Sequence, residues 1–306
     1  MWTALALALL VLGFEIGGGL LSGSLALLSD ATHVAVDVAA LLIGLGAARL
    51  AARDPDANHT YGYHRLEAVG ALANAVLLIA ASAAILTESF GRLLAPSAVD
   101  APIALGVATV ALVVNTGSAW LIHGIGRRTA ATRVLVLHLA GDAAGALAVI
   151  VSALIIMSGG PPVADAVASF LIAVLLAAAG LRLLGQIVHL LAEGVPASVS
   201  VAAAADALRA VPGVGAVHDL HVWALAEDLP LVTAHLELAP ASNPAAVLEG
   251  ATRALRDIGV GHTTVQVEGE GCGQGRATEP APSRAATSHA TPTFPIDQQT
   301  GGASHG

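Results

Sequence analysis

Six long apolar runs constrain this chain more than any other feature. They cover roughly residues 2–21, 25–48, 66–92, 101–123, 134–157 and 163–190. Each run is long enough to cross a bilayer as an α-helix. Only 11% of the 306 residues are charged while 56% are hydrophobic, which is too apolar for an ordinary soluble domain. We therefore predict an α-helical membrane protein whose residues 1–194 form a six-helix transmembrane bundle.

The arginines predict how these helices are oriented. All 13 basic residues are arginine. The third break has only Arg92 and the first and fifth have none, while six arginines flank the second and fourth breaks: Arg49, Arg53, Arg65, Arg127, Arg128 and Arg133. The positive-inside rule then places the second and fourth loops, and with them both termini, in the cytoplasm. The first run lacks a basic leader and a cleavage site, so we interpret it as a span and not as a signal peptide. We expect a multi-pass protein of the bacterial inner membrane.

The sequence changes character after Pro196. Helical patterns at 199–211 and 244–258 alternate with strand patterns at 214–226, 231–239 and 262–268. This αββαβ order predicts a small cytoplasmic α+β domain, ferredoxin-like, over residues 195–270. In the first strand His218, Leu220 and Val222 alternate with Asp219, His221 and Trp223, which predicts two opposite faces. Residues 271–306 are rich in Gly, Pro, Ser and Thr, and we expect a disordered tail.

Two His–Asp pairs lie inside the apolar runs. His33 and Asp37 are four residues apart, as are His138 and Asp142, so each pair shares one helix face. Ionisable groups within a membrane indicate a functional site. Two imidazole nitrogens and two carboxylate oxygens suit a tetrahedral zinc ion, with cobalt or cadmium as alternatives. Hydrogen bonding between helices is the structural alternative. Asp30, one turn before His33, is either a partner of these ligands, a charge at the entrance or a ligand itself.

Several stretches together resemble the cation diffusion facilitator family of zinc transporters. They are GGGLLSGSLALLSDATHVAVD, TYGYHRLEAVGAL, HLAGDAAGALAVI, and VHDLHVWAL followed by AHLEL and TVQVE. The resemblance covers about residues 10–268. It implies that the two His–Asp pairs bind the transported zinc ion, and that a homodimer exchanges this ion for protons. The protein would then be a secondary active transporter and not an enzyme.

The resemblance also implies two further metal sites. In the cytoplasmic domain, His218, His235 and Glu268 match positions of regulatory zinc ligands near the dimer interface, with His221 or water in a fourth position. Ordinary edge-strand polarity is the alternative, and His262 and Cys272 are weaker candidates. In the second loop, Asp56 and His59 match ligands of a second ion that some relatives bind. The third position holds Tyr63, with His64 beside it, which departs from the pattern.

Proton exchange also follows from the ligand chemistry, because zinc and protons compete for the same nitrogen and oxygen atoms. The partners we expect are zinc, protons, the lipid bilayer and a second copy of the chain. The net charge of −9 argues against nucleic acid.

The rival functions are a membrane zinc sensor, an exporter that prefers cadmium or cobalt, and an intramembrane metalloprotease. The last is disfavoured because no His-Glu dipeptide of the H-E-x-x-H type occurs. Some polar residues in the spans receive no role: Glu15, Asn74, Glu88, Asn115 and Asp165.

Overall fold

The computed structural model of the chain describes the backbone of residues 2–124 and 130–269, and the side chains of residues 9–121, 136 and 139–269. The expected tail at 271–306, with Cys272, lies outside the described residues, as does the side chain of His138. The chain divides into two compact units. The first comprises Met1–Ser198 with Trp223–Leu231, and the second comprises Val199–Val222 with Val232–Gly306.

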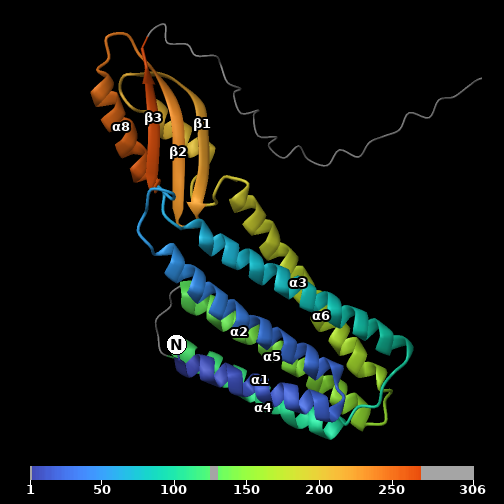
Figure 1. Cartoon of the computed structure of the whole chain (residues 1–306). Coiled ribbons are helices and arrows are strands. Elements are labelled where there is room, and N and C mark those ends of the chain that lie inside the picture. The colour runs from blue at the N-terminus through green and yellow to red at the C-terminus, as the bar shows by residue number, and fades with distance from the viewer. Residues whose placement is uncertain (1, 125–129, 270–306) are drawn as a thin grey trace, which may run out of the picture. The chain divides into compact units, whose positions relative to one another are not determined.

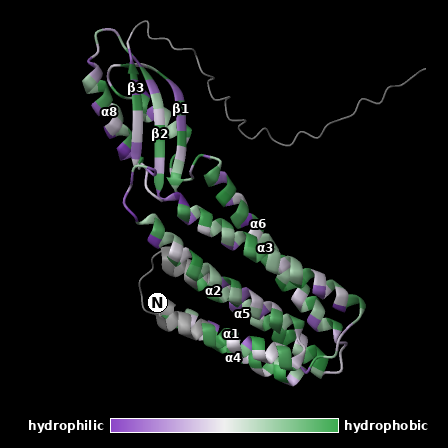
Figure 2. Cartoon of the chain, viewed as in Figure 1, coloured by the Kyte–Doolittle hydropathy of each residue, from purple (hydrophilic) through white to green (hydrophobic). Residues whose placement is uncertain are grey.

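Long helices make up the first unit (Figure 1). They are α1 (Trp2–Ser22), α2 (Leu25–Ala51), α3 (Arg65–Leu94), α4 (Ala101–Gly124), α5 (Ala130–Met157) and α6 (Val163–Leu191). Helices α2 to α6 are long and apolar enough to cross a membrane, and α1 contributes an apolar helix over Leu9–Ser22 among the residues searched. Figure 2 shows the hydrophobic colouring along these helices. The predicted helical membrane architecture is confirmed.

Small residues let the helices of this unit approach closely. Helix α3 packs against α6, α4 packs against α5, and α2 contacts α1, α3 and α6. A Cβ atom at Gly18 of α1 would lie 2.5 Å from Val107 of α4, and one at Gly19 would lie 2.6 Å from Leu28 of α2. Close backbone approach at small residues is how membrane helices gain contact without a hydrophobic driving force. The glycines after Glu15 therefore bring α1 against both neighbours.

Asp165 of α6 fixes the start of α2. Its Oδ1 atom accepts a hydrogen bond from the Ser24 hydroxyl at 2.5 Å, and its Oδ2 atom accepts from the backbone N–H groups of Leu25 at 2.6 Å and Ala26 at 3.2 Å. The first N–H groups of a helix lack partners within the helix. A carboxylate from another helix satisfies them here and also suits the positive end of the α2 dipole. This contact anchors the helix that carries His33 and Asp37.

The second unit contains the small α+β domain. Its elements are α7 (Val201–Arg209), β1 (Val214–Ala226), β2 (Leu229–Leu238), α8 (Pro244–Asp257) and β3 (His262–Glu268), and the sheet order is β1-β2-β3. The side chains of Ser200 and Asn243 cap the two helices. Leu208 of α7 and Leu255 of α8 are buried in one core with Leu236 of β2. Both helices therefore cover one face of the sheet, which confirms the predicted αββαβ fold.

One prediction about β1 is wrong, because the alternation of its side chains breaks at Asp219. Asp219 has a left-handed backbone conformation with φ of 48°. Val217 packs against the core, as do Leu220 and Val222, so one extra residue is accommodated between positions 217 and 220. Asp tolerates this conformation better than most residues do, and such an insertion acts as a β-bulge. His218 therefore lies on the sheet face opposite the helices, not on the face of Leu220 and Val222.

Candidate metal centres

The first candidate centre joins α2 and α5 within the helical unit. The Nε2 atom of His33 lies 3.5 Å from Oδ2 of Asp37 and 3.3 Å from Oδ1 of Asp142. One ligand atom from each of the three residues lies within 4.8 Å of the other two. Ligand atoms about 2.1 Å from a tetrahedral zinc ion are roughly 3.4 Å apart. The three side chains thus have the spacing of three ligands of one ion, and the α2 pair comes from a single helical turn.

The charges of this group also favour a cation. The imidazole Nε2 atom can carry only one proton, yet it faces two carboxylate oxygens. One proton cannot make two well-aligned hydrogen bonds in different directions. The Asp142 side chain is only 10% exposed and that of His33 is 18% exposed, so solvent screens the group weakly. A divalent ion between the three atoms would balance both carboxylates.

Two other predicted candidates belong to the same region of the bundle. His138 lies in α5, four residues before Asp142, and its side chain lies outside the described residues. Asp30 is buried on α2 with only 2% of its surface exposed. A Cβ atom at Gly145 of α5 would lie 2.5 Å from Oδ1 of Asp30, so this glycine makes room for the carboxylate. Within the described residues Asp30 does not join the group of three ligand atoms.

The second candidate centre lies on the helix-free face of the sheet. The Nε2 atom of His218 lies 3.2 Å from Oε2 of Glu268, and Nδ1 of His235 lies 3.0 Å from Oε1 of Glu268. The three residues form the other described group with metal-ligand spacing. Gln266 donates a hydrogen bond of 2.8 Å to Oε1 of Glu268 and so orients the buried carboxylate. Each strand of the sheet therefore supplies one donor, and the bulge at Asp219 makes the contribution of β1 available.

Additional acids lie around this second group. Asp219 is 3.6 Å from Nε2 of His235 and 3.1 Å from Nε2 of His221, and Glu237 is 3.8 Å from Nε2 of His218. His221 thus pairs with Asp219 and not directly with Glu268. Asp219 is also the acidic partner of the His235 nitrogen that faces away from Glu268, and such a partner fixes the ring orientation and strengthens the ring as a ligand. The predicted fourth donor, His221, is not among the three residues with metal-ligand spacing in the described part of the domain.

In the loop before α3 the structure pairs Asp56 with Tyr63. The hydroxyl of Tyr63 donates a hydrogen bond of 2.6 Å to Oδ2 of Asp56, while the backbone N–H groups of Asn58 and His59 donate to Oδ1 at 2.8 Å each. These bonds, that from Tyr63 first, lower the pKa of Asp56 to about 2. The hydrogen bond to Asp56 also raises the pKa of Tyr63. A metal ion at Asp56 would compete with the phenol.

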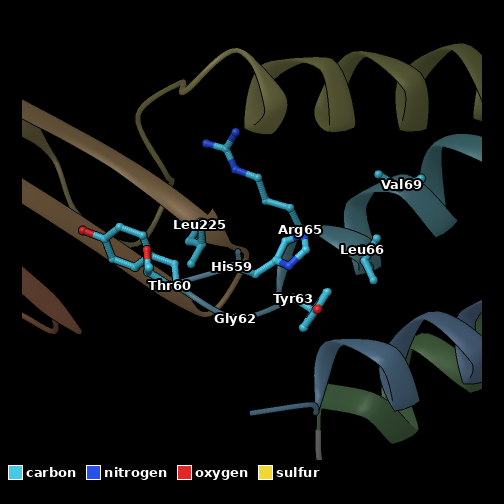
Figure 3. Close-up of a pocket in the computed structure, with 9 residues that line it drawn as sticks. His59, Thr60, Gly62, Tyr63, Arg65, Leu66, Val69 and Leu225 are labelled. Atoms are coloured by element: carbon cyan, nitrogen blue, oxygen red, sulfur yellow. The ribbon is translucent and has the colours of Figure 1, made fainter. Parts of the chain in front are cut away.

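The candidate loop ligands are not equally close to one another. His59 lies 3.3 Å from Asp56, and its ring centroid is 4.3 Å from that of Tyr63. The groups of three or more metal-type side chains found in the described residues do not include Asp56, His59 and His64. Figure 3 shows a pocket beside this loop, lined by His59 and Tyr63 together with residues at the start of α3 such as Leu66. The loop site stays a prediction.

Two structural roles could not be read from the sequence. The spacing of 141 residues between Ser24 and Asp165 gives no hint that one caps the helix of the other. The left-handed backbone at Asp219 sits inside a run that has ordinary strand alternation in the sequence. The left-handed residue had one weak indication in the sequence, namely an Asp inside a segment that otherwise favours a β-strand.

Comparison with known protein families divides the chain in a similar way. Residues 1–192 match the cation efflux transmembrane domain, and residues 196–270 match the cation efflux protein, cytoplasmic domain. The two matches together cover both described units and include every described candidate ligand.

Individual relatives agree with these matches. The chain is 36% identical to the zinc transporter ZitB of Escherichia coli strain K12 over 261 residues, covering 84% of this chain and 83% of the relative. It is 34% identical to the metal cation efflux system protein CzcD of Cupriavidus metallidurans, covering 90% and 88%. It is 31% identical to the cadmium, cobalt and zinc/H(+)-K(+) antiporter of Bacillus subtilis strain 168, covering 83% of each chain. The chain is therefore a multi-pass membrane protein of the cation efflux family, the cation diffusion facilitators.

Proposed function

We propose that this chain exports zinc from the cytoplasm across the bacterial inner membrane in exchange for protons. His33, Asp37, His138 and Asp142 would hold the transported ion. The observation that carries this proposal is the group of three ligand atoms within 4.8 Å of one another on two membrane helices. The names of the relatives support zinc as the cargo and exchange as the mode of transport. Cadmium and cobalt are the other cargoes that the same ligands could hold.

Ligand chemistry supplies the coupling. Zinc binds neutral imidazole and ionised carboxylate, so protons and metal exclude one another from the same atoms. An ordinary histidine titrates near pH 6.5, which lies between typical pH values on the two sides of an inner membrane. A site facing the cytoplasm would take up the ion, and the same site facing the acidic side would release the ion and return protonated. Both termini and the second and fourth loops would lie in the cytoplasm.

The cytoplasmic part would act as a regulator and a dimerisation domain. We place its boundary with the transport domain between residues 194 and 195, close to the limits of the family matches. His218, His235 and Glu268 would bind a regulatory zinc ion. In support, a ring nitrogen of each histidine lies within hydrogen-bonding distance of the Glu268 carboxylate, and the three residues come from three different strands. The loop residues Asp56, His59 and His64 would form a third site only after Tyr63 releases Asp56.

Metal flux into proteoliposomes tests the proposal. With the cytoplasmic face outward and an acidic interior, we expect zinc uptake that rises with the imposed pH gradient and an interior that becomes more alkaline as zinc enters. Parallel runs with cadmium and cobalt give the ion preference. Binding without flux would indicate a membrane zinc sensor. Flux that ignores the gradient would indicate a channel or uniporter.

A further inference from the structure

Glu15 is a carboxylate sealed inside the helical bundle. Only 1% of the residue is exposed. Neither of its two carboxylate oxygens has a hydrogen-bond partner among the described residues. Buried side-chain oxygens almost always have such a partner, and those that lack one call for an explanation. Packing alone does not supply it, because an apolar side chain would fill the same space at lower cost.

The sequence of α1 explains how the carboxylate becomes sealed. Gly18 and Gly19 follow Glu15 by three and four residues, so they lie on the same helix face. Their missing side chains allow Val107 of α4 and Leu28 of α2 to contact α1 directly. The face that carries Glu15 is therefore pressed against both neighbouring helices. In this structure the close packing shields the carboxylate from solvent, so proton exchange with water requires the helices around Glu15 to separate.

The surroundings of Glu15 connect it to the first metal centre. It interacts electrostatically with Asp30 and His33 of α2 and with Asp142 of α5. Helix α4, which also packs against α1, has no acidic or basic residue in its described part, Ala101 to Leu121. Glu15 is not a member of the described group of ligand atoms, so an ion held there would lie near it without being bound by it. The side chain of His138, which precedes Asp142 by four residues on α5, is outside the described residues.

A carboxyl group in this position responds to the charge of the metal centre. Without a metal ion its neighbours include two acids, and a third negative charge without hydrogen bonds is costly in a dry environment. With a divalent cation at His33 and Asp142, the same negative charge is favourable. The occupancy of the metal centre and the protonation of Glu15 are then linked, and the linkage acts equally in both directions.

We propose that Glu15 binds a transported proton at a site separate from the metal ligands. This inference rests on the proposed metal–proton exchange. When a metal ion enters the centre, the O–H bond of Glu15 breaks and the proton passes to water, leaving a carboxylate beside the cation. When the ion leaves on the other side, the carboxylate takes a proton from water there and becomes neutral again. Glu15 thus carries one proton for each metal ion, in addition to those that the metal ligands exchange, and it is neutral again at the end of the cycle.

Proton release on metal binding is the direct test. The full-length protein in detergent is titrated with zinc in a weakly buffered solution containing a pH dye, and zinc binding is measured in parallel by equilibrium dialysis. We expect Glu15→Gln to release about one proton fewer per zinc ion than the unmodified chain, since glutamine has the same shape but does not titrate. Glu15→Asp should restore release. Glu67→Gln, at an exposed position of α3, is the matched control and should release as many protons as the unmodified chain.

Infrared difference spectra provide a second test, and its main result is read from the unmodified chain. Adding zinc to the unmodified chain should remove a carbonyl band of a protonated carboxyl group, and the band should be absent from Glu15→Gln. Unchanged proton release from a folded Glu15→Gln variant, or no such band in the unmodified chain, would overturn the proposal. Failure of the antiport itself would look different, because zinc flux through the unmodified chain would then ignore the imposed pH gradient.

Discussion

The two candidate metal centres are built from different secondary structure. In the membrane unit, His33 and Asp37 come from one turn of α2 and Asp142 comes from α5. In the cytoplasmic domain, His218, His235 and Glu268 come from three strands of one sheet. Two helices can shift relative to each other with their internal hydrogen bonds intact, whereas neighbouring strands are joined by their ladder. We therefore expect the ligand distances of the first candidate centre to change more readily than those of the second.

The anchoring of the two centres differs in the same sense. Asp165 holds helix α2 at its start, where it accepts a hydrogen bond from the N–H group of Leu25. His33 lies about two turns further along the helix, so this contact does not fix the candidate ligand directly. The sheet centre has immediate support, because Gln266 bonds Glu268 and Asp219 lies beside His235. The sheet centre is therefore supported by contacts to its own candidate ligands, whereas the contact of Asp165 supports only the start of α2.

The largest effect is expected from removing a membrane ligand. Asp142→Ala should reduce zinc flux by more than about tenfold, because losing a ligand costs more than losing a partner of a ligand. Initial zinc uptake into proteoliposomes measures this effect, with Asp206→Ala as the exposed control. Flux near that of the unmodified chain would show that Asp142 is not a ligand of the transported ion, and the helical group would then not be a transport site.

The sheet centre should affect regulation and leave basal transport in place. The double variant His218→Ala, His235→Ala should lose the activation of flux by zinc on the cytoplasmic side, because two of three donors are gone. Uptake is measured at low and high zinc on that side. If basal flux disappeared as well in a protein that still inserts and folds, the sheet centre would take part directly in transport.

Removing the anchor of α2 should lower stability more than removing an exposed cap. Asp165→Ala leaves the Ser24 hydroxyl and two buried N–H groups without their acceptor, which should cost about 1–3 kcal/mol of unfolding free energy. Ser200→Ala removes a single exposed cap bond of α7 and should cost about 0.5–1 kcal/mol. Thermal unfolding in detergent measures both. Equal effects would mean that the contact to Asp165 does not anchor α2.

The bulge in β1 should control zinc affinity in the cytoplasmic domain. Asp219→Val disfavours the left-handed backbone by about 1–2 kcal/mol and should move His218 off the face of His235, weakening zinc binding by about tenfold. Asp219→Asn tolerates the conformation but loses the carboxylate beside His235, so it should bind more tightly than Asp219→Val and less tightly than the unmodified chain. Equilibrium dialysis of the full-length chain carrying Asp142→Ala isolates the sheet centre. Similar binding by the Val and Asn variants would show that the bulge does not position His218.

The smallest effect is expected in the loop. Tyr63→Phe removes the strongest contribution to the low pKa of Asp56, so this pKa should rise from about 2 toward its ordinary value of 3.8. Because the folded-state pKa is depressed, the bonds of Asp56 contribute fully above its ordinary value and are lost as pH falls through about 2. In the variant, the smaller contribution should already be lost completely at a pH above about 2. An NMR titration of the Asp56 carboxyl checks this, and an unchanged midpoint would contradict it.

Much of the fold and part of the site followed from local patterns. The six apolar runs predicted the helices to within four residues, because the length of a span is set by the thickness of the bilayer. The pairing of His33 with Asp37 followed from helical spacing, which is independent of the rest of the chain. The face of His218 could not be predicted, since a single left-handed residue changes the alternation of a strand.

The sequence by itself determined the membrane class, the order of elements and the ligands that share a helical turn. These depend on hydrophobicity and on the periods of helix and strand, which act over a few residues. The meeting of Asp142 with His33 was expected from the two motifs and the resemblance, and the structure brings the two side chains together. The tertiary structure alone decided that Asp165 caps α2 and that the glycines of α1 enclose Glu15. Those contacts join residues far apart in the chain, and only the packing of the helices sets the distances between them.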